Sequence, residues 1–165
     1  MHALLNADTA SSAVTYRERL SPSLWTLLSA AVAAPMVTLV FVPLDATVAL
    51  VAGLGVAVAL VLALVFASPV VEVAGGELRV GRAHIPVGML GSASGAVGEE
   101  ARQVRGPGLP RTAWHLLRGG IDGVVRVAVL DERDPVSEWV FSTRTPDRVL
   151  AALSRAQRAA QADND

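Results

Sequence analysis

The chain has 165 residues, of which 52% are hydrophobic and 18% are charged, and its formal net charge at pH 7 is −1. This composition is too apolar and too weakly charged for an ordinary soluble domain. The near-zero net charge argues against nucleic acid as a partner. The absence of cysteine excludes a disulfide framework, a thiol nucleophile and a cysteine-ligated metal.

The two ends of the chain carry no sign of regular structure. Residues 1–15 are rich in alanine and serine and lack periodicity, and residues 161–165 are polar. We predict a disordered tail at each end. The N-terminal residues do not have the pattern of a signal peptide, because no basic start is followed directly by an apolar core.

Two long apolar segments follow the N-terminal tail. No charged residue occurs in 20–44 or in 46–71. Segments 24–42 and 46–67 are each long enough to cross a bilayer, since a helix rises about 1.5 Å per residue. The rest of the chain is too short to surround two helices that are apolar on every side. We therefore predict a transmembrane helical hairpin within residues 16–69.

The short connection between these segments forces an antiparallel arrangement and ends at Asp45, which is suited to cap the second helix. Arg17 and Arg19 precede the first segment, Arg79 and Arg82 follow the second, and the connection has no positive charge. The positive-inside tendency then predicts a multi-pass protein of the cell membrane with both termini in the cytoplasm.

Small residues recur at every fourth position of the second segment, a spacing that lets helix backbones approach closely. Two such stripes are present: Ala49, Gly53 and Ala57, and Gly55, Ala59 and Ala63. Alanine is so common here that the spacing also arises by chance. In the first segment, Pro35 predicts a kink.

Residues 70–160 have the pattern of a small α+β domain on the cytoplasmic side. Gly75-Gly76 separates two short strands and predicts a two-residue hairpin turn. Further strands are indicated at 124–130 and 138–142. The number of strands between residues 83 and 118 stays open.

The last element of this domain is predicted to be an amphipathic helix that begins at Thr145 as its N-cap. Its apolar face includes Leu150 and Leu153, which we expect to pack with Trp139 and Phe141 in the core. The predicted fold class is therefore an α+β membrane protein. A two-helix transmembrane hairpin precedes a small bent antiparallel sheet, and a C-terminal amphipathic helix closes the sheet.

No catalytic or metal-binding constellation is evident. The three histidines are far apart and have no carboxylate at ligand spacing: His2, His84 and His115. Ser142, His115 and Asp131 are the residue types of a hydrolase triad, but no Gly-x-Ser-x-Gly elbow accompanies them. Residues 131–134 lack the alternating ligands and closing glutamate of a calcium loop. We predict no enzymatic activity, no cofactor and no metal.

Five arginines of the predicted domain are candidate contacts to an anionic membrane surface or to a partner: Arg79, Arg82, Arg105, Arg111 and Arg118. A basic group near such a surface contributes about 1 kcal/mol, although plain surface solubility also explains these residues. Arg79 and Arg82 follow the turn at Gly75-Gly76. They approach the membrane only if this β-hairpin folds back toward it, which we predict.

Three stretches of the sequence are distinctive: Tyr16–Leu20, Glu77–Gly81 and Trp139–Pro146. Over about residues 16–157 the chain resembles an actinobacterial membrane family catalogued as domain-of-unknown-function family 3093. The resemblance implies the layout of a hairpin followed by a domain and brings no known activity, so no functional residue is carried over. The strands closed by one C-terminal helix are also similar to bacterial pleckstrin-homology-like domains.

These observations favour a membrane-anchored, non-enzymatic interaction module. Its expected partners are the lipid bilayer and a membrane or cytoplasmic protein. An accessory subunit of a membrane transporter or envelope assembly, held through the hairpin, is the alternative. A pore formed by this chain alone is disfavoured because the apolar segments contain no ionisable residue. The oligomeric state stays open.

Overall fold

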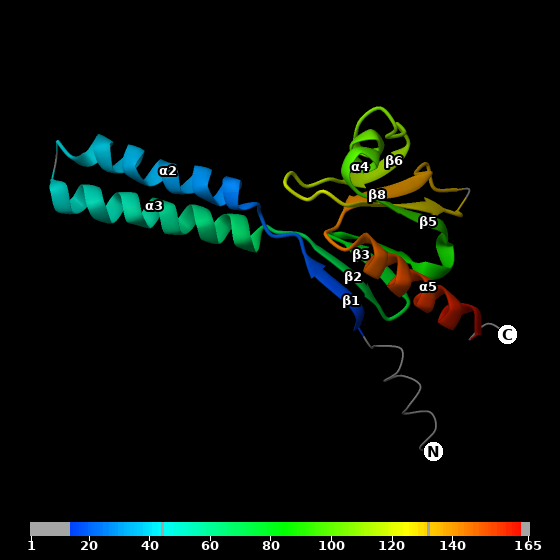
Figure 1. The fold of residues 1–165 in the computed structure, drawn as a ribbon. Coiled ribbons are helices and arrows are strands. Elements are labelled where there is room, and N and C mark those ends of the chain that lie inside the picture. Colours follow the sequence, from blue (N-terminus) through cyan, green and yellow to red (C-terminus); the bar gives the residue numbers. More distant parts are fainter. Residues whose placement is uncertain (1–13, 44, 132, 163–165) are drawn as a thin grey trace, which may run out of the picture. The chain divides into compact units, whose positions relative to one another are not determined.

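The computed structural model describes residues 14–43, 45–131 and 133–162, so the predicted tails lie largely outside the described residues. The described chain forms two units (Figure 1): a helical hairpin, Ser21–Ser68, and an α+β domain made of the residues on either side of it. Together the described residues hold four α-helices and two four-stranded sheets.

The hairpin consists of α2 (Leu24–Phe41) and α3 (Ala46–Phe66). Both helices are long and apolar enough to cross a membrane. Asp45 caps α3 as predicted, because its carboxylate accepts from the backbone amides of Thr47 at 2.8 Å and Val48 at 2.9 Å. None of the residues of α2 is buried, so most of its apolar surface is left uncovered by the chain itself.

One of the two small-residue stripes packs α3 against α2. Ala49 and Gly53 are the buried residues of α3, and a Cβ atom added at Gly53 would collide with the Thr38 hydroxyl and lie 2.9 Å from the Ala34 carbonyl oxygen. A Cβ atom added at Gly55 would meet nothing within 4 Å. The first stripe therefore allows the close approach of the helices, and the second faces away from α2.

Replacing Gly53 by alanine should loosen the hairpin, and the same change at Gly55 should not. Alanine favours a helix over glycine by about 1 kcal/mol at either position, but only at Gly53 does the new methyl group collide with α2. We expect Gly53→Ala to lower, and Gly55→Ala to preserve or raise, the midpoint of thermal helix loss, measured by circular dichroism of the full chain in mild detergent. Equal shifts in the two variants would contradict this packing.

The first sheet contains β1 (Val14–Arg19), β2 (Val70–Ala74), β3 (Glu77–Val80) and β4 (Ala83–Pro86), antiparallel and in sequence order. Strands β1 and β2 flank the helical hairpin in the sequence but are direct neighbours in the sheet. The pairing continues to the end of both strands, where the Leu20 amide donates to the Pro69 carbonyl oxygen at 2.9 Å. The hairpin is thus an insertion between two paired strands.

This pairing corrects two predicted boundaries. Residues 14 and 15 were expected in a tail and residues 16–20 in the hairpin, but they belong to the domain, which does not begin at residue 70. The correction has a simple cause: Tyr16, Glu18 and Leu20 alternate with arginines, which is a strand pattern, but β1 has no partner nearby in the sequence. The strand that pairs with it comes only after two long helices.

The β2–β3 turn forms as predicted. Gly75 and Gly76 adopt positive φ angles of 57° and 74°, a conformation that side chains other than glycine rarely tolerate. Strand β3 then runs back along β2, and the Gly81 amide donates to the Val70 carbonyl oxygen at 2.8 Å. The turn therefore returns Arg82 to the residues that directly follow the hairpin.

The second sheet contains β5 (Leu90–Ala96), β6 (Ala113–Leu116), β7 (Val124–Val129) and β8 (Glu138–Ser142), in the order β5-β7-β8-β6. Strands β6 and β8 are parallel. The prediction of one bent antiparallel sheet was therefore wrong: the domain has two sheets, and one strand pair is parallel.

The difference arises in the segment whose strand count was left open. The 3-10 helix η1 (Val87–Met89) separates the two sheets, and helix α4 (Gly98–Arg105) follows β5. The loop after β6 crosses one end of the sheet before β7 begins, which places β6 beside β8 in parallel. Crossings of this kind depend on tertiary packing and leave little periodicity in the sequence.

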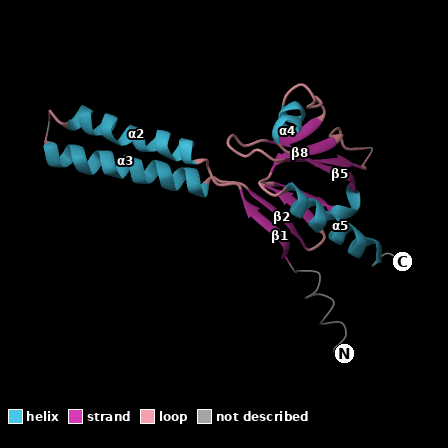
Figure 2. Ribbon diagram, viewed as in Figure 1, coloured by secondary structure: helices cyan, strands magenta, loops and turns pink. Residues whose placement is uncertain are grey.

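The main core lies between the two sheets and helix α5 (Pro146–Ala162) (Figure 2). Trp139, Phe141 and Leu153 are buried in it and Leu150 packs at its edge, which confirms the predicted core residues. A smaller cluster lies on the other face of the second sheet, where α4 covers Val124 and Val140. Both faces of β8 are therefore covered, which explains why four successive residues of this strand are buried.

Candidate functional site

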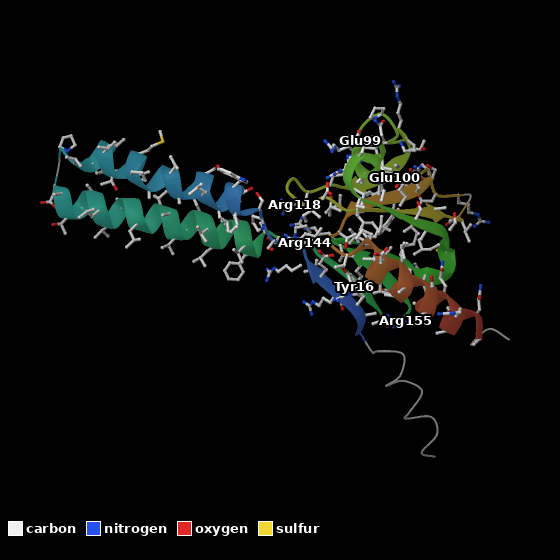
Figure 3. All side chains as sticks on the ribbon, viewed as in Figure 1. Tyr16, Glu99, Glu100, Arg118, Arg144 and Arg155 are labelled. Carbon is white, nitrogen blue, oxygen red and sulfur yellow. The ribbon has the colours of Figure 1, made fainter. Side chains whose placement is uncertain are left out.

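Several segments that are far apart in the sequence meet at one end of the domain. We call it the attachment end and define it by residues 18–20, 69–70, 81–82, 116–118 and 142–145. The contacts that join these segments are the Leu20–Pro69 and Gly81–Val70 hydrogen bonds, the close approach of Gly81 to Leu116, and the hydrogen bond from the Arg118 amide to the Ser142 hydroxyl at 2.9 Å. In Figure 3, Arg118 and Arg144 project from this end, and Arg155 lies farther along α5.

Glu18 is the centre of a polar network at the attachment end. Strand β1 turns this side chain inward beside Val71, and only 13% of it is exposed. One carboxylate oxygen accepts from the Tyr16 hydroxyl at 2.6 Å and from the Thr143 hydroxyl at 2.5 Å. The other accepts from the Arg144 amide at 2.9 Å. The carboxylate therefore ties β1 to the corner between β8 and α5.

Arg144 strengthens the same connection. Its guanidinium lies 3.7 Å from the Glu18 carboxylate and donates to the Arg19 carbonyl oxygen at 3.2 Å. The Tyr16 hydroxyl donates a hydrogen bond to the Glu18 carboxylate, so the Tyr16 oxygen accepts a hydrogen bond from the Thr145 hydroxyl at 2.8 Å. Charge-assisted hydrogen bonds of this kind are roughly twice as strong as neutral ones. Strand β1 lies at the edge of the sheet, where backbone pairing holds it on one side only. These side-chain contacts hold it in place as well.

The network raises the pKa of Tyr16 above its ordinary value. The main cause is partial burial, which disfavours the phenolate, and the hydrogen bond to the Glu18 carboxylate adds to it. Hydrogen bonds with Thr143 and Thr145 act in the opposite direction. The folded domain therefore holds the phenolic proton more tightly than the unfolded chain does.

Stability should fall when the pH rises above about 10, the pKa of an unfolded tyrosine. The contribution of Tyr16 is fully present below that pH and is lost as the pH rises through the higher pKa of the folded state. Tyr16 is the only tyrosine, and the chain has no lysine or cysteine to titrate nearby. Phenolate absorbance should show a midpoint above 10 in the folded protein and near 10 in denaturant. Tyr16→Phe should flatten the decline in stability, and an identical decline would contradict the assignment.

The five predicted arginines occupy different places. Arg82 and Arg118 lie at the attachment end. Arg79 is on the outer face of the first sheet, where it pairs with Glu77 at 2.9 Å. Arg105 joins α4 to the loop between β6 and β7 by donating to the Ile121 and Asp122 carbonyl oxygens. Arg111 precedes the start of β6, at the opposite end of that strand from Arg118.

Sequence reasoning did not choose Arg19 and Arg144 as contacts, although both lie at the attachment end. The sequence did contain a feature that could have indicated these two residues. Arg19 lies in the Tyr16–Leu20 stretch and Arg144 in the Trp139–Pro146 stretch, two of the stretches that carry the family resemblance. The structure shows that these two stretches, far apart in the sequence, are hydrogen-bonded to each other.

The geometry offers little for catalysis. Ser142 is buried, and its hydroxyl accepts from the Arg118 amide. Among the described residues, no group of three histidine or acidic side chains is arranged to hold a metal ion. A groove of about 540 Å³ lies between α5 and the start of β5, where the Gln157 amide donates to the Leu90 and Gly91 carbonyl oxygens. Of the described residues that line it, only Arg158 is ionisable, so it contains no acid–base pair.

Comparison with known proteins identifies the family and no function. The model of a family described as a protein of unknown function (DUF3093) matches residues 15–153. No curated protein and no solved structure matches the chain. The matched region begins within β1, contains the whole helical hairpin and ends within α5, so both halves of the Glu18 network lie inside it. The chain belongs to the DUF3093 family.

Proposed function

We propose that this protein is a membrane-anchored, non-enzymatic interaction module. In this proposal the hairpin spans the cell membrane twice, and the domain lies in the cytoplasm, where it contacts a protein partner or the anionic membrane surface. Large apolar side chains are exposed along both helices, among them Leu28, Val32, Leu39, Val51, Leu54 and Leu62. Burial in lipid removes this apolar surface from water.

The observation that carries the proposal is the insertion of the hairpin between two paired strands. Arg19 is the register partner of Val70, so the chain leaves the domain and returns to it at the same place. Two helices that each cross a bilayer return the chain to the side from which it started. The pairing of β1 with β2 therefore favours a topology in which both ends of the chain are on one side.

The side of the membrane on which the domain lies is inferred from the placement of the arginines. Arg17 and Arg19 directly precede the hairpin, and Arg82 follows Gly81, which is hydrogen-bonded to Val70 shortly after the hairpin in the sequence. The described residues of the connection, Pro43 and Asp45, carry no positive charge. The positive-inside tendency favours the cytoplasm for the arginine-rich side.

Single cysteines test this topology, because the chain has none of its own. Pro43→Cys, in the connection, should react with a membrane-impermeant thiol reagent in intact cells. Ala159→Cys, on the exposed face of α5, should react only after the cells are opened. Labelling of Ala159→Cys in intact cells would overturn the cytoplasmic assignment, and extraction of the protein by alkaline carbonate would overturn membrane insertion.

The proposal of a non-enzymatic module is supported by the Glu18 network, in which the Glu18 carboxylate is occupied by the Tyr16 and Thr143 hydroxyls and the Arg144 amide. The closing C-terminal helix of the domain also supports a pleckstrin-homology-like layout, which we propose as a fold analogy. Strand β1 and the parallel strand β6 are departures from the single bent antiparallel sheet expected for that layout. Incubation of the purified protein with metabolite mixtures should give no turnover.

A second candidate function is that of an accessory subunit of a transporter or envelope assembly. The small residues of α3 that face away from α2, Gly55, Ala59 and Ala63, favour it because they would let another helix approach closely. Affinity purification from native membranes separates the two candidates. If the hairpin alone retains the partner, the accessory-subunit function is supported. If the partner is lost when only the surface of the domain is changed, the interaction-module function is supported.

A further inference from the structure

We infer that the attachment end is a contact surface for anionic phospholipid headgroups, in which Arg19 and Arg82 are the main contacts and Arg118 adds charge. This inference rests on the proposed membrane insertion and names the partner of the domain. It replaces the sequence-based choice of Arg79, Arg105 and Arg111.

The first argument is the length of the chain that joins this end to the apolar helices. Ser21–Ser23 separates Leu20 from α2, and only Ala67 and Ser68 separate α3 from Pro69. At about 3.5 Å per residue, these connections reach roughly 10 Å. The Debye length at physiological salt is about 8 Å. The points where the domain joins the hairpin are thus kept at about one Debye length from the ends of the helices, and Arg19 and Arg82 lie next to these points in the sequence or in the sheet.

The second argument is whether each arginine has a carboxylate within ion-pair distance. Of the ten arginines outside the attachment end, five form an ion pair with a carboxylate: Arg17, Arg79, Arg102, Arg105 and Arg126. Arg19 and Arg82 are exposed and have no carboxylate within ion-pair distance among the described residues. Their charge is available for an external anion.

The third argument is the placement of the nearby carboxylates. Glu18 faces inward and is occupied by the Tyr16, Thr143 and Arg144 contacts. Asp122 is directed to α4, where it accepts from the Gly98 amide and lies 3.6 Å from Arg105. In the first turn of α5, Asp147 and Arg148 are both exposed, and their formal charges sum to zero. The attachment end therefore presents an excess of positive charge although the chain as a whole carries −1.

Phosphate is the anion that fits these groups best. A guanidinium donates to phosphate oxygens through a planar pair of N–H groups. A lipid headgroup is already present at this end in any inserted protein, whereas a soluble anion would have to be captured from solution. Two arginines that each contribute about 1 kcal/mol should shift the ratio of surface-bound to released domain by roughly 30-fold.

The test uses the full chain in lipid vesicles. A dye is attached to Gly119→Cys, an exposed position next to Arg118 where a side chain meets open space. Quenching by nitroxide-labelled headgroups is compared in vesicles of phosphatidylcholine alone and with phosphatidylglycerol added. We expect stronger quenching with phosphatidylglycerol and loss of the difference at high salt. Arg19→Gln with Arg82→Gln should abolish most of it.

The matched control removes the same charge elsewhere. Arg133 lies between β7 and β8, at the ends of these strands opposite Ser142, and Arg155 is on the exposed face of α5. Arg133→Gln with Arg155→Gln should leave the lipid dependence unchanged. Equal quenching in both lipids, or an equal loss in the control, would overturn the inference. Flotation of the labelled protein with the vesicles and resistance to carbonate show insertion separately, so a failed insertion is distinguished from a failed headgroup contact.

Discussion

Trp139→Ala is expected to make the α+β domain sensitive to protease, because it removes a large part of the free energy of unfolding. The Trp139 ring is 6% exposed and lies between the two sheets, with its centroid 4.5 Å from that of Trp114. Replacing a buried aromatic residue by alanine costs about 3–5 kcal/mol, and the whole stability of a domain is about 5–15 kcal/mol. Limited proteolysis of the full chain in detergent should show rapid cleavage within residues 70–162.

Trp25→Ala is the matched control, because it removes the same side chain from an exposed position. Trp25 is 78% exposed at the start of α2 and belongs to the other unit of the chain. Its replacement should leave the protease resistance of the domain unchanged. Undiminished resistance of the Trp139→Ala protein would show that the core does not depend on this ring.

Glu18→Ala should release strand β1 from the domain. The substitution leaves the Tyr16 and Thr143 hydroxyls and the Arg144 amide without their acceptor. Hydrogen bonds to a charged group contribute about 1.5–3 kcal/mol, and donors left buried add to the loss. We expect a drop in the free energy of unfolding of about 2–3 kcal/mol, with faster hydrogen exchange concentrated in β1 and in the facing amides of β2. Glu18→Gln should be milder, because its amide oxygen still accepts.

Glu77→Ala provides the comparison for this prediction. Glu77 also pairs with an arginine, Arg79, but on the outer face of the first sheet. Exposed ion pairs contribute less than about 1 kcal/mol, so this variant should unfold close to the wild type and keep β1 protected. If the two glutamate variants were equally stable, the Glu18 network would have no special part in holding β1.

The Glu18 network also strengthens the attachment of β1, which connects the helical hairpin to the domain. Leu20 follows β1 directly and leads through three residues into α2, while Pro69 leads from α3 into β2. Along the chain, a force on the first helix reaches the domain through β1. Backbone pairing with β2 and the bonds to Thr143 and Arg144 are what resist it.

The sequence by itself determined the features that depend on local pattern. Unbroken apolarity defined both hairpin helices, Asp45 specified the start of α3, and Gly75-Gly76 specified the β2–β3 turn. Alternation placed Trp139 and Phe141 in the core. Each of these outcomes is decided by residues close together in the chain, through helix capping, glycine conformation or the period of hydrophobic positions.

Tertiary structure alone decided which distant segments meet. The partner of β1 lies beyond two helices, and β6 adds to β8 in parallel after the chain has crossed the end of the sheet. In the sequence, Glu18 is only one of several charged residues before the first helix. In the folded domain its side chain points inward and accepts hydrogen bonds from Thr143 and Arg144. The same folding pairs Arg79 with Glu77 and leaves Arg19 and Arg82, at one end, with no carboxylate within ion-pair distance among the described residues. Such contacts depend on the free energy of the whole packed domain, which no local sequence pattern records.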